Sequence, residues 1–172
     1  IRDSVPVILA LLQIWYRNGF GAQTRAILPY DFGLRLLPDY LQQLEMESLG
    51  NSVRRDGAPV ERDSCPIIWG APGNNGQHAF YQMLHQGTTL VPSDFLIAAH
   101  SGCEGSDAVG EASHQEGVIA NALAQMEALM NGRDLEASEA ELHARGMGED
   151  ASWLAPHLVM AGNQPSTAIV YD

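Results

Sequence analysis

Two ionisable side chains in the first half of the chain, Glu47 and His78, are of types that can transfer protons in catalysis. Glu47 lies in the segment Gln42–Ser48, and His78 stands 31 positions later, just after the glycine-rich segment Gly70–Gly76. A carboxylate in partly apolar surroundings can move a proton between adjacent carbon atoms, because desolvation raises its pKa toward neutrality. A histidine titrates near neutral pH and can shuttle a proton at a ligand site. The two residues are therefore candidate catalytic groups.

Each of these residues also has a plain structural interpretation. A glutamate on a short helix is usually a solvated surface residue, and a histidine that opens a helix is often satisfied by backbone groups. Helical spacing nevertheless puts Glu47 on one face with Tyr40 and Leu44, and Gln43 stands one turn before it on a neighbouring line. We therefore expect the Glu47 carboxylate to turn toward the inside of the fold, with Gln43 close by.

The elements around these candidates must place them at a common edge. A helix opens at Pro38, the apolar run Pro66–Gly70 predicts a strand, and the residues Gln77–Gln86 predict a helix that Gly87 ends. A strand, a glycine-rich turn and a helix in this order often bind an anion, because the helix N-terminal amides point at the ligand. Ligands of such folds lie beyond the carboxyl ends of the strands. We expect Glu47 and His78 to reach that one rim of the sheet.

The rest of the chain alternates helical and strand patterns. Ser4 can cap a helix that has Pro6 in its first turn and ends near Gly19, and its apolar stripe is expected on Ile8, Leu11, Leu12 and Trp15. A capping box at Ser113 opens another helix, which Gly132 stops. The remaining expected elements are strands over 25–28, 94–99 and 166–171, a helix over 138–144, a loop or weak hairpin over 50–63, and a mobile loop over 100–112. The alternation predicts one domain over 1–172, a three-layer αβα sandwich on a mainly parallel sheet.

Composition excludes several classes of function. The 172 residues are 45% hydrophobic, and 21 acidic side chains against nine basic ones give a formal net charge of −12. This balance argues against a nucleic-acid partner or an anionic membrane. Cys65 and Cys103 lie in no metal-binding spacing, which favours a reduced, cytosolic protein without a metal. The glycine-rich segment matches neither nucleotide-binding signature, so we expect no nucleotide site.

The sequence resembles the glucose-6-phosphate isomerase family over nearly its whole length. Residues 20–31 match the family's FGAxTxAILPYD, residues 40–48 match YLQQLxMES, and residues 70–88 match GxPGxNGQHAFYQxLHQGT. The resemblance implies the second sugar-isomerase (SIS) domain of a two-SIS-domain enzyme of glycolysis and gluconeogenesis. Such an enzyme interconverts glucose 6-phosphate and fructose 6-phosphate in the cytoplasm without metal or cofactor.

The same resemblance implies roles for particular residues. Glu47 matches the base that transfers a proton through a cis-enediol, His78 matches the histidine that helps to open the sugar ring, and Gln43 matches a glutamine near the substrate. In the family that histidine reaches the active site of a neighbouring subunit, so the resemblance implies a homodimer.

Several family segments have no counterpart in this sequence. They are the phosphate-binding serine and threonine segment of the first domain, the GGR motif, and the C-terminal DQWGVELGK stretch with its catalytic lysine. Since all nine basic residues are arginines, no lysine can substitute. We therefore expect a piece of an isomerase truncated at both ends. Two alternatives stay open: a non-catalytic SIS module that binds a sugar phosphate, and a half-protein that only oligomerises.

Overall fold

A parallel β-sheet forms the centre of the fold. The computed structural model describes the backbone of residues 2–100 and 108–172 and the side chains of residues 2–100 and 114–172. Within them the sheet has the strand order β2-β1-β3-β4, with every neighbouring pair parallel. The strands are β1 Thr24–Tyr30, β2 Ile67–Gly70, β3 Ser93–Ala98 and β4 Ser166–Tyr171.

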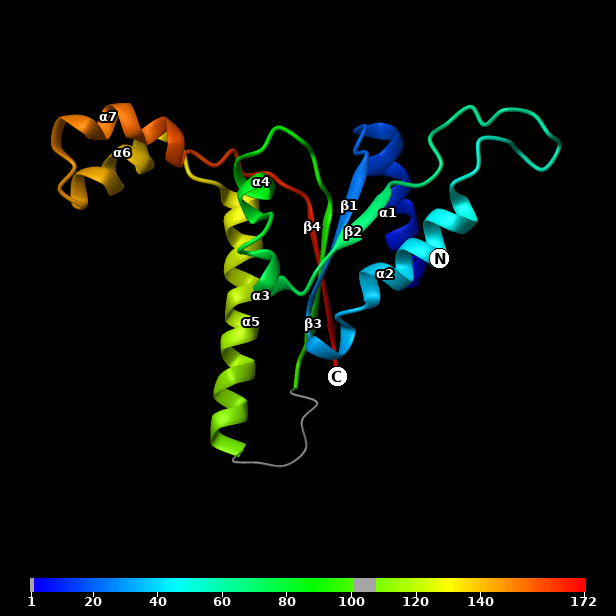
Figure 1. Ribbon diagram of the computed structural model, residues 1–172, viewed down its shortest axis with the longest axis horizontal. Helices are drawn as coiled ribbons and strands as arrows, with labels where there is room; N and C mark the ends of the chain where they lie inside the picture. The colour runs from blue at the N-terminus through cyan, green and yellow to red at the C-terminus, as the bar shows by residue number, and fades with distance from the viewer. Residues whose placement is uncertain (1, 101–107) are drawn as a thin grey trace.

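Helices cover both faces of this sheet, as Figure 1 shows. One face carries α3 Gly73–Gly76, α4 Tyr81–Gln86 and α5 Ala108–Asn131, and the other carries α1 Val5–Gly19, α2 Leu37–Leu41 and η2 Gln42–Glu47. The central strand β1 reads as a nearly continuous apolar run because both of its faces are covered. The predicted three-layer αβα architecture on a parallel sheet is therefore confirmed.

The two faces of the sheet differ in character. Alternate residues of β1 and β3, such as Leu28 and Phe95, point toward α4 and α5 and form the main apolar core with Tyr81 and Leu129. The residues between them point toward α1 and η2, and they include the charged Arg25 and Asp94. Among the described residues, the sheet thus has one mainly apolar face without charged residues and one face that carries a charge cluster.

The chain between α5 and β4 forms a small unit of short helices. It contains α6 Leu135–Ala144, η3 Gly148–Asp150, α7 Ala151–Leu154 and η4 Ala155–Leu158. Their own small cluster includes Leu142, Ala151 and Ala155. A further short turn, η1 Phe32–Leu34, follows β1, and an isolated bridge between Val53 and Pro59 gives the expected weak hairpin.

Several predicted boundaries were wrong: the helix expected over 138–144 begins at Leu135, and the strand expected over 25–28 covers Thr24–Tyr30. The helix expected to open at Ser113 already begins at Ala108; residues 101–107 of the predicted loop lie outside the described residues. The helix expected from Gln77 begins at Tyr81 instead. Phe80 interrupts it with φ −142°, and its ring packs edge-on against Trp69 with centroids 4.8 Å apart. Tertiary packing of this aromatic side chain overrides the local helical pattern.

The first helix was predicted with nearly correct bounds. Its predicted buried stripe was mostly wrong, because apolar residues surround the helix on almost all sides and the pattern does not select one of them. The side chains nearer the sheet are those of Leu9, Leu12, Gln13 and Tyr16, whereas Leu11 and Trp15 are exposed. In the described part of the chain, no helix combines the length and apolar character that crossing a membrane requires.

Candidate functional site

The segment that carries Gln43 and Glu47 is a π-helix, η2, packed against the edge strand β2. The Gln42 side chain donates a hydrogen bond of 3.0 Å from Nε2 to the Ile68 carbonyl oxygen. The Ile68 N–H in turn donates to Sδ of Met46 over 3.3 Å. Such π-helical turns are rare and are often found at functional sites. Two side chains of η2 thus fix it to one backbone position of the sheet.

A third side chain of η2, Glu45, points between the helices. Its Oε2 accepts a hydrogen bond of 2.9 Å from Nε2 of Gln13 on α1, and its Oε1 lies 3.6 Å from Nη1 of Arg25 on β1. Gln42, Glu45 and Met46 together occupy the inner side of η2. Any other residue of this helical turn must therefore point outward.

Gln43 and Glu47 are both exposed on the outer side of η2. The expectation that Glu47 turns inward with Tyr40 and Leu44 was wrong, because those two side chains are themselves 60% and 50% exposed. The physical reason is that anchoring residues fill the inner side, and the π-helical turn shifts the face that a regular helix would present. The contact of the Glu47 carboxylate is local: it accepts a hydrogen bond of 3.3 Å from Oγ of Ser48.

His78 lies in the turn between α3 and α4 and is exposed. Its backbone N–H donates to the Asn75 carbonyl oxygen over 3.1 Å. The preceding residue anchors the turn, since Nε2 of Gln77 donates to Oδ1 of Asn121 over 2.8 Å and to the Tyr30 hydroxyl over 3.3 Å. Gln77 fills the inner position, which leaves the His78 ring on the outside.

A single copy of the chain does not bring Glu47 and His78 together. Glu47 belongs to the α1–η2 layer, whereas His78 belongs to the layer of α3, α4 and α5 on the opposite face of the sheet. The expectation that both reach one rim was therefore wrong within one copy. The short η2 packs flat on the sheet instead of ending at the rim where the Gly70–Gly76 turn lies.

The carboxyl edge of the sheet carries a different pocket, of about 380 Å³. It lies beyond β1 and β3, where the strand order changes direction, which is where ligands of parallel sheets bind. Its polar lining includes Asp31, Asn74, His100 and His114. Asp31 is held by the Tyr171 hydroxyl, which donates to Oδ2 over 2.7 Å. No sequence pattern singled out His100 and His114, although His100 directly follows the strand expected over 94–99.

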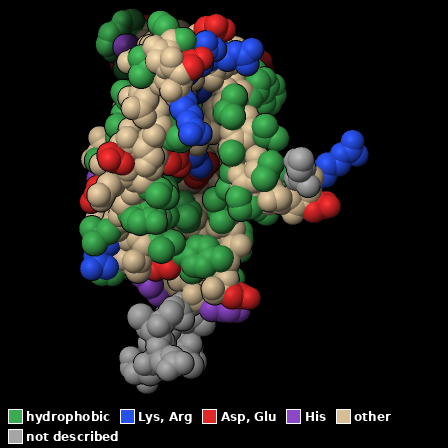
Figure 2. All heavy atoms as spheres, turned by 90° about the vertical axis from the view of Figure 1, so that its right-hand side faces the viewer, with side chains coloured by type: hydrophobic (Ala, Val, Ile, Leu, Met, Phe, Trp, Pro, Cys, Tyr) green, Lys and Arg blue, Asp and Glu red, His purple; other side chains and the backbone are tan. Residues whose placement is uncertain are grey.

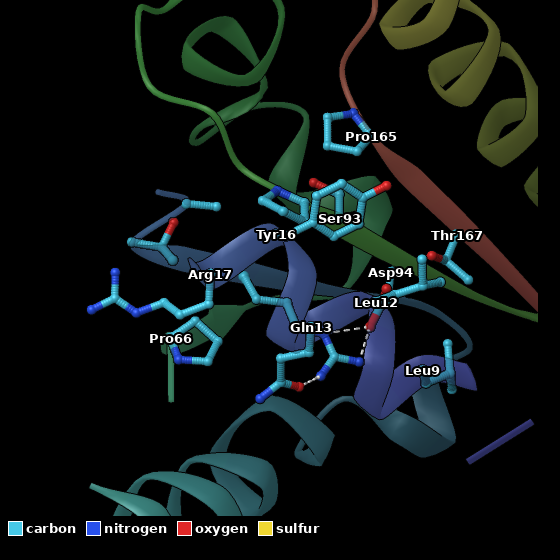
Figure 3. Close-up of a pocket in the computed structure, with 14 residues that line it drawn as sticks. Leu9, Leu12, Gln13, Tyr16, Arg17, Pro66, Ser93, Asp94, Pro165 and Thr167 are labelled. Atoms are coloured by element: carbon cyan, nitrogen blue, oxygen red, sulfur yellow. Dashed lines mark hydrogen bonds and ion pairs between the residues drawn. The ribbon is translucent and has the colours of Figure 1, made fainter. Parts of the chain in front are cut away.

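A buried charge cluster lies beneath α1, and Figure 3 shows it beside a small cavity. Arg25 donates from Nε to Oδ2 of Asp94 over 2.8 Å, and its other nitrogens contact Asp94 and Gln13. Burial raises the pKa of Asp94, and the Arg25 guanidinium offsets this only in part. The cavity of about 20 Å³ has room for one water molecule. This cluster supports η2 through the contact between Arg25 and Glu45. The only indication of the cluster in the sequence is the presence of charged residues within apolar strands.

The described side chains include no group of three or more His, Cys, Asp or Glu residues placed to hold a metal ion. The chemistry available on the η2 surface is that of a carboxylate and an amide on an anchored helix.

Comparison with known proteins gives one consistent result. The family model for phosphoglucose isomerase matches residues 1–172. The glucose-6-phosphate isomerase of Xanthobacter autotrophicus is 52% identical over 172 residues, covering 99% of this chain, and that of Rhizobium rhizogenes is 51% identical over 173 residues, also covering 99% of it. The chain spans only 30% and 31% of these two relatives.

Solved structures agree with the sequence comparison. The crystal structure of a glucose-6-phosphate isomerase from Chlamydia trachomatis matches with a TM-score of 0.78 and 34% identity, covering 99% of this chain and 30% of that one. A hypothetical protein from Thermus thermophilus matches with a TM-score of 0.59 at 21% identity, covering 98% of this chain and 34% of that one, which shows a shared fold alone.

Proposed function

The chain belongs to the phosphoglucose isomerase family, and from this membership we propose that it forms the proton-transferring part of an enzyme that interconverts glucose 6-phosphate and fructose 6-phosphate. The domain is of the SIS type, and the enzyme acts in the cytoplasm, in glycolysis and gluconeogenesis. In this proposal Glu47 is the base, Gln43 lies beside the substrate, and His78 helps to open the sugar ring.

The proposed chemistry is a proton transfer between neighbouring carbons. Glu47 removes the proton from C2 of the open-chain aldose, and the released electron pair forms the C1–C2 double bond of a cis-enediol while the C1 carbonyl oxygen gains a proton. Return of the proton to C1, with loss of the proton from the C2 hydroxyl, gives the ketose. No atom is gained or lost overall, so the reaction needs no redox partner.

The observation that carries the proposal is the anchoring of η2. Gln42, Glu45 and Met46 fix the helix to β2, α1 and β1, and they leave Gln43 and Glu47 together on its free side. A catalytic group must be held in place by packing and hydrogen bonds of its neighbours. A carboxylate on an otherwise solvated helix would not need three separate anchors.

The exposure of Glu47 supports the proposal that polypeptide outside these 172 residues completes the site. A general base works best in partly apolar surroundings, and these 172 residues leave Glu47 in solvent. The position of His78 in the opposite layer supports a homodimer, because a histidine there can serve a neighbouring subunit more readily than its own Glu47. The sugar phosphate and the second subunit are thus the proposed partners.

The alternative function is a non-catalytic SIS module that binds a sugar phosphate. The separation of Glu47 from His78 within one copy favours it over turnover by the isolated chain. One experiment distinguishes the two functions. A chimera in which this chain replaces the matching 30% of the Xanthobacter autotrophicus relative is assayed beside the isolated chain for conversion of fructose 6-phosphate.

We expect turnover by the chimera and none by the isolated chain. A chimera that is stabilised by fructose 6-phosphate against thermal unfolding but does not convert it would instead support the binding module. Turnover by the isolated chain would contradict the proposal that other polypeptide is required.

A further inference from the structure

The outward side of α1 presents apolar side chains to solvent. Its central residues are Val7, Leu11, Ile14 and Trp15, here called the outer face of α1, and all four are exposed. None of the residues of α1 is fully buried. A helix that is apolar on every side is normally enclosed by protein on every side. Here the sheet covers only one side.

The surface beside this face is hollowed and has a polar border. A hollow of about 600 Å³ lies beside it, floored by Leu11, Ile14 and Trp15 and bordered by the segment 61–63. Interfaces between proteins have this arrangement, with an apolar centre and a polar border. Figure 2 shows apolar side chains gathered over this side of the molecule, on both sides of a groove with charged groups at its floor.

The groove continues the apolar surface toward η2. It has a volume of about 610 Å³ and separates α1 from α2 and η2, with Leu9, Leu37 and Leu41 among its lining residues. On its far side Leu36, Tyr40 and Leu44 are exposed as well. Contiguous apolar surface on this scale marks an interaction site.

We propose that the outer face of α1 is the docking surface for the part of the longer family polypeptide that these 172 residues do not include. The occupant follows from length, because the chain spans only about 30% of its relatives. More than twice as much polypeptide as the chain itself must therefore pack somewhere in a protein of the family's size. Burial of the outer face of α1 would stabilise such a protein by about 25 cal/mol for each Å² of apolar area removed from water. The inference holds whether or not Glu47 is catalytic.

The test compares two leucines of similar exposure that lie on opposite sides of the sheet. Leu11 on the outer face of α1 is 56% exposed, and Leu123 on α5 is 53% exposed. Leu11→Cys and Leu123→Cys are each made in a background with Cys65→Ser and Cys103→Ser, in the isolated chain and in the chimera with the Xanthobacter autotrophicus relative. The rate of reaction with a thiol reagent then reports the accessibility of each site.

We expect the Leu11→Cys thiol to react at least about tenfold more slowly in the chimera than in the isolated chain, because access limits thiol reaction. The Leu123→Cys thiol should react at nearly the same rate in both. Equal rates for Leu11→Cys in both proteins would overturn the proposal, and so would equal slowing of both thiols. If the Leu11→Cys thiol of the isolated chain reacts more slowly as the protein concentration rises, a second copy is the occupant, and this result would also overturn the proposal.

A second pair of variants gives a readout that does not depend on thiol chemistry. Leu11→Asp should leave the urea midpoint of the isolated chain unchanged and lower that of the chimera, whereas Leu123→Asp should leave both midpoints unchanged. A chimera that tolerates Leu11→Asp as well as Leu123→Asp would contradict docking at this face, whatever its isomerase activity.

Discussion

The amide of Gln13 on α1 donates a hydrogen bond of 2.9 Å to the carboxylate of Glu45 on η2, which ties together the two helices that border the groove. Glu45 also lies 3.6 Å from Arg25, so it links α1, β1 and the helix that carries Glu47. The support of the candidate base therefore depends on a neighbouring carboxylate that plays no part in the proposed chemistry.

Replacement of Glu45 should destabilise the chain and loosen η2. We expect Glu45→Ala to lower the free energy of unfolding by about 1.5–3 kcal/mol, because it removes a hydrogen bond and an ion pair of a partly buried carboxylate. Urea unfolding measures this loss, and faster hydrogen exchange of the η2 amides should accompany it. Glu61→Ala, in an exposed loop, is the control and should change stability by less than about 0.5 kcal/mol. Equal effects of the two variants would contradict the anchoring role of Glu45.

The buried tyrosine pair predicts a loss of stability at alkaline pH. The hydroxyls of Tyr30 and Tyr81 lie 2.9 Å apart in the core, and burial raises the pKa of both above the ordinary 10.0. The unfolded chain therefore releases protons that the folded chain retains. The contribution of this pair to the free energy of unfolding is fully present below pH 10. Above pH 10 it falls by up to about 1.4 kcal/mol per pH unit for each tyrosine.

Phenylalanine variants check this prediction through urea unfolding across the alkaline range. Tyr81→Phe should make the decline above pH 10 shallower, since it removes one of the two titrating groups. Tyr40→Phe changes an exposed tyrosine and should leave the decline as it is in the parent chain. A decline that is unchanged in Tyr81→Phe would show that other groups cause it.

Gly73, at the start of α3, should tolerate no side chain. A Cβ atom there would lie 2.0 Å from Cε2 of Tyr30, so Gly73→Ala must displace α3 or the buried ring. We expect a loss of about 1–3 kcal/mol in the free energy of unfolding. Gly117→Ala on α5, where a Cβ meets no atom within 4 Å, should stabilise the chain by about 0.5–1 kcal/mol. Unfolding experiments that give the same sign for both variants would contradict this packing.

Local patterns predicted most elements of the fold. The final strand Ser166–Tyr171 was predicted with the correct bounds, and α1 begins directly after the expected cap residue Ser4 and ends at Gly19. Buried parallel strands bounded by proline and glycine leave a clear pattern in sequence, as do helices that begin with a cap and end at glycine. These signals are local, so they survive without knowledge of the tertiary contacts.

The faces of the helices were harder to predict. The apolar stripe of α1 was placed on Ile8, Leu11, Leu12 and Trp15, but only Leu12 of these lies toward the sheet. The helix is apolar on nearly all sides, and periodicity cannot choose between a face that meets the sheet and one that meets other polypeptide. In the structure one side of α1 faces the sheet and the other is exposed, so the pattern alone was ambiguous.

The sequence named candidate site residues but did not predict their surroundings. Glu47 and Gln43 do share a side of η2, but the π-helical turn and its inward anchors place that side in solvent. The buried pair of Arg25 and Asp94 that supports η2 joins residues 69 positions apart, and no local pattern reports such a contact. Tertiary contacts decided the environment of the site, and those contacts were invisible in the sequence.

The most direct test of the proposed function is the effect of Glu47→Gln on turnover by the chimera with the Xanthobacter autotrophicus relative. We predict that kcat for fructose 6-phosphate falls by about 10²–10⁴-fold, the usual contribution of a general base, while the urea midpoint is unchanged. The exposed Glu61→Gln should keep full activity. If Glu47→Gln retains kcat within a few-fold of the parent, Glu47 is not the base and the account of this site is wrong.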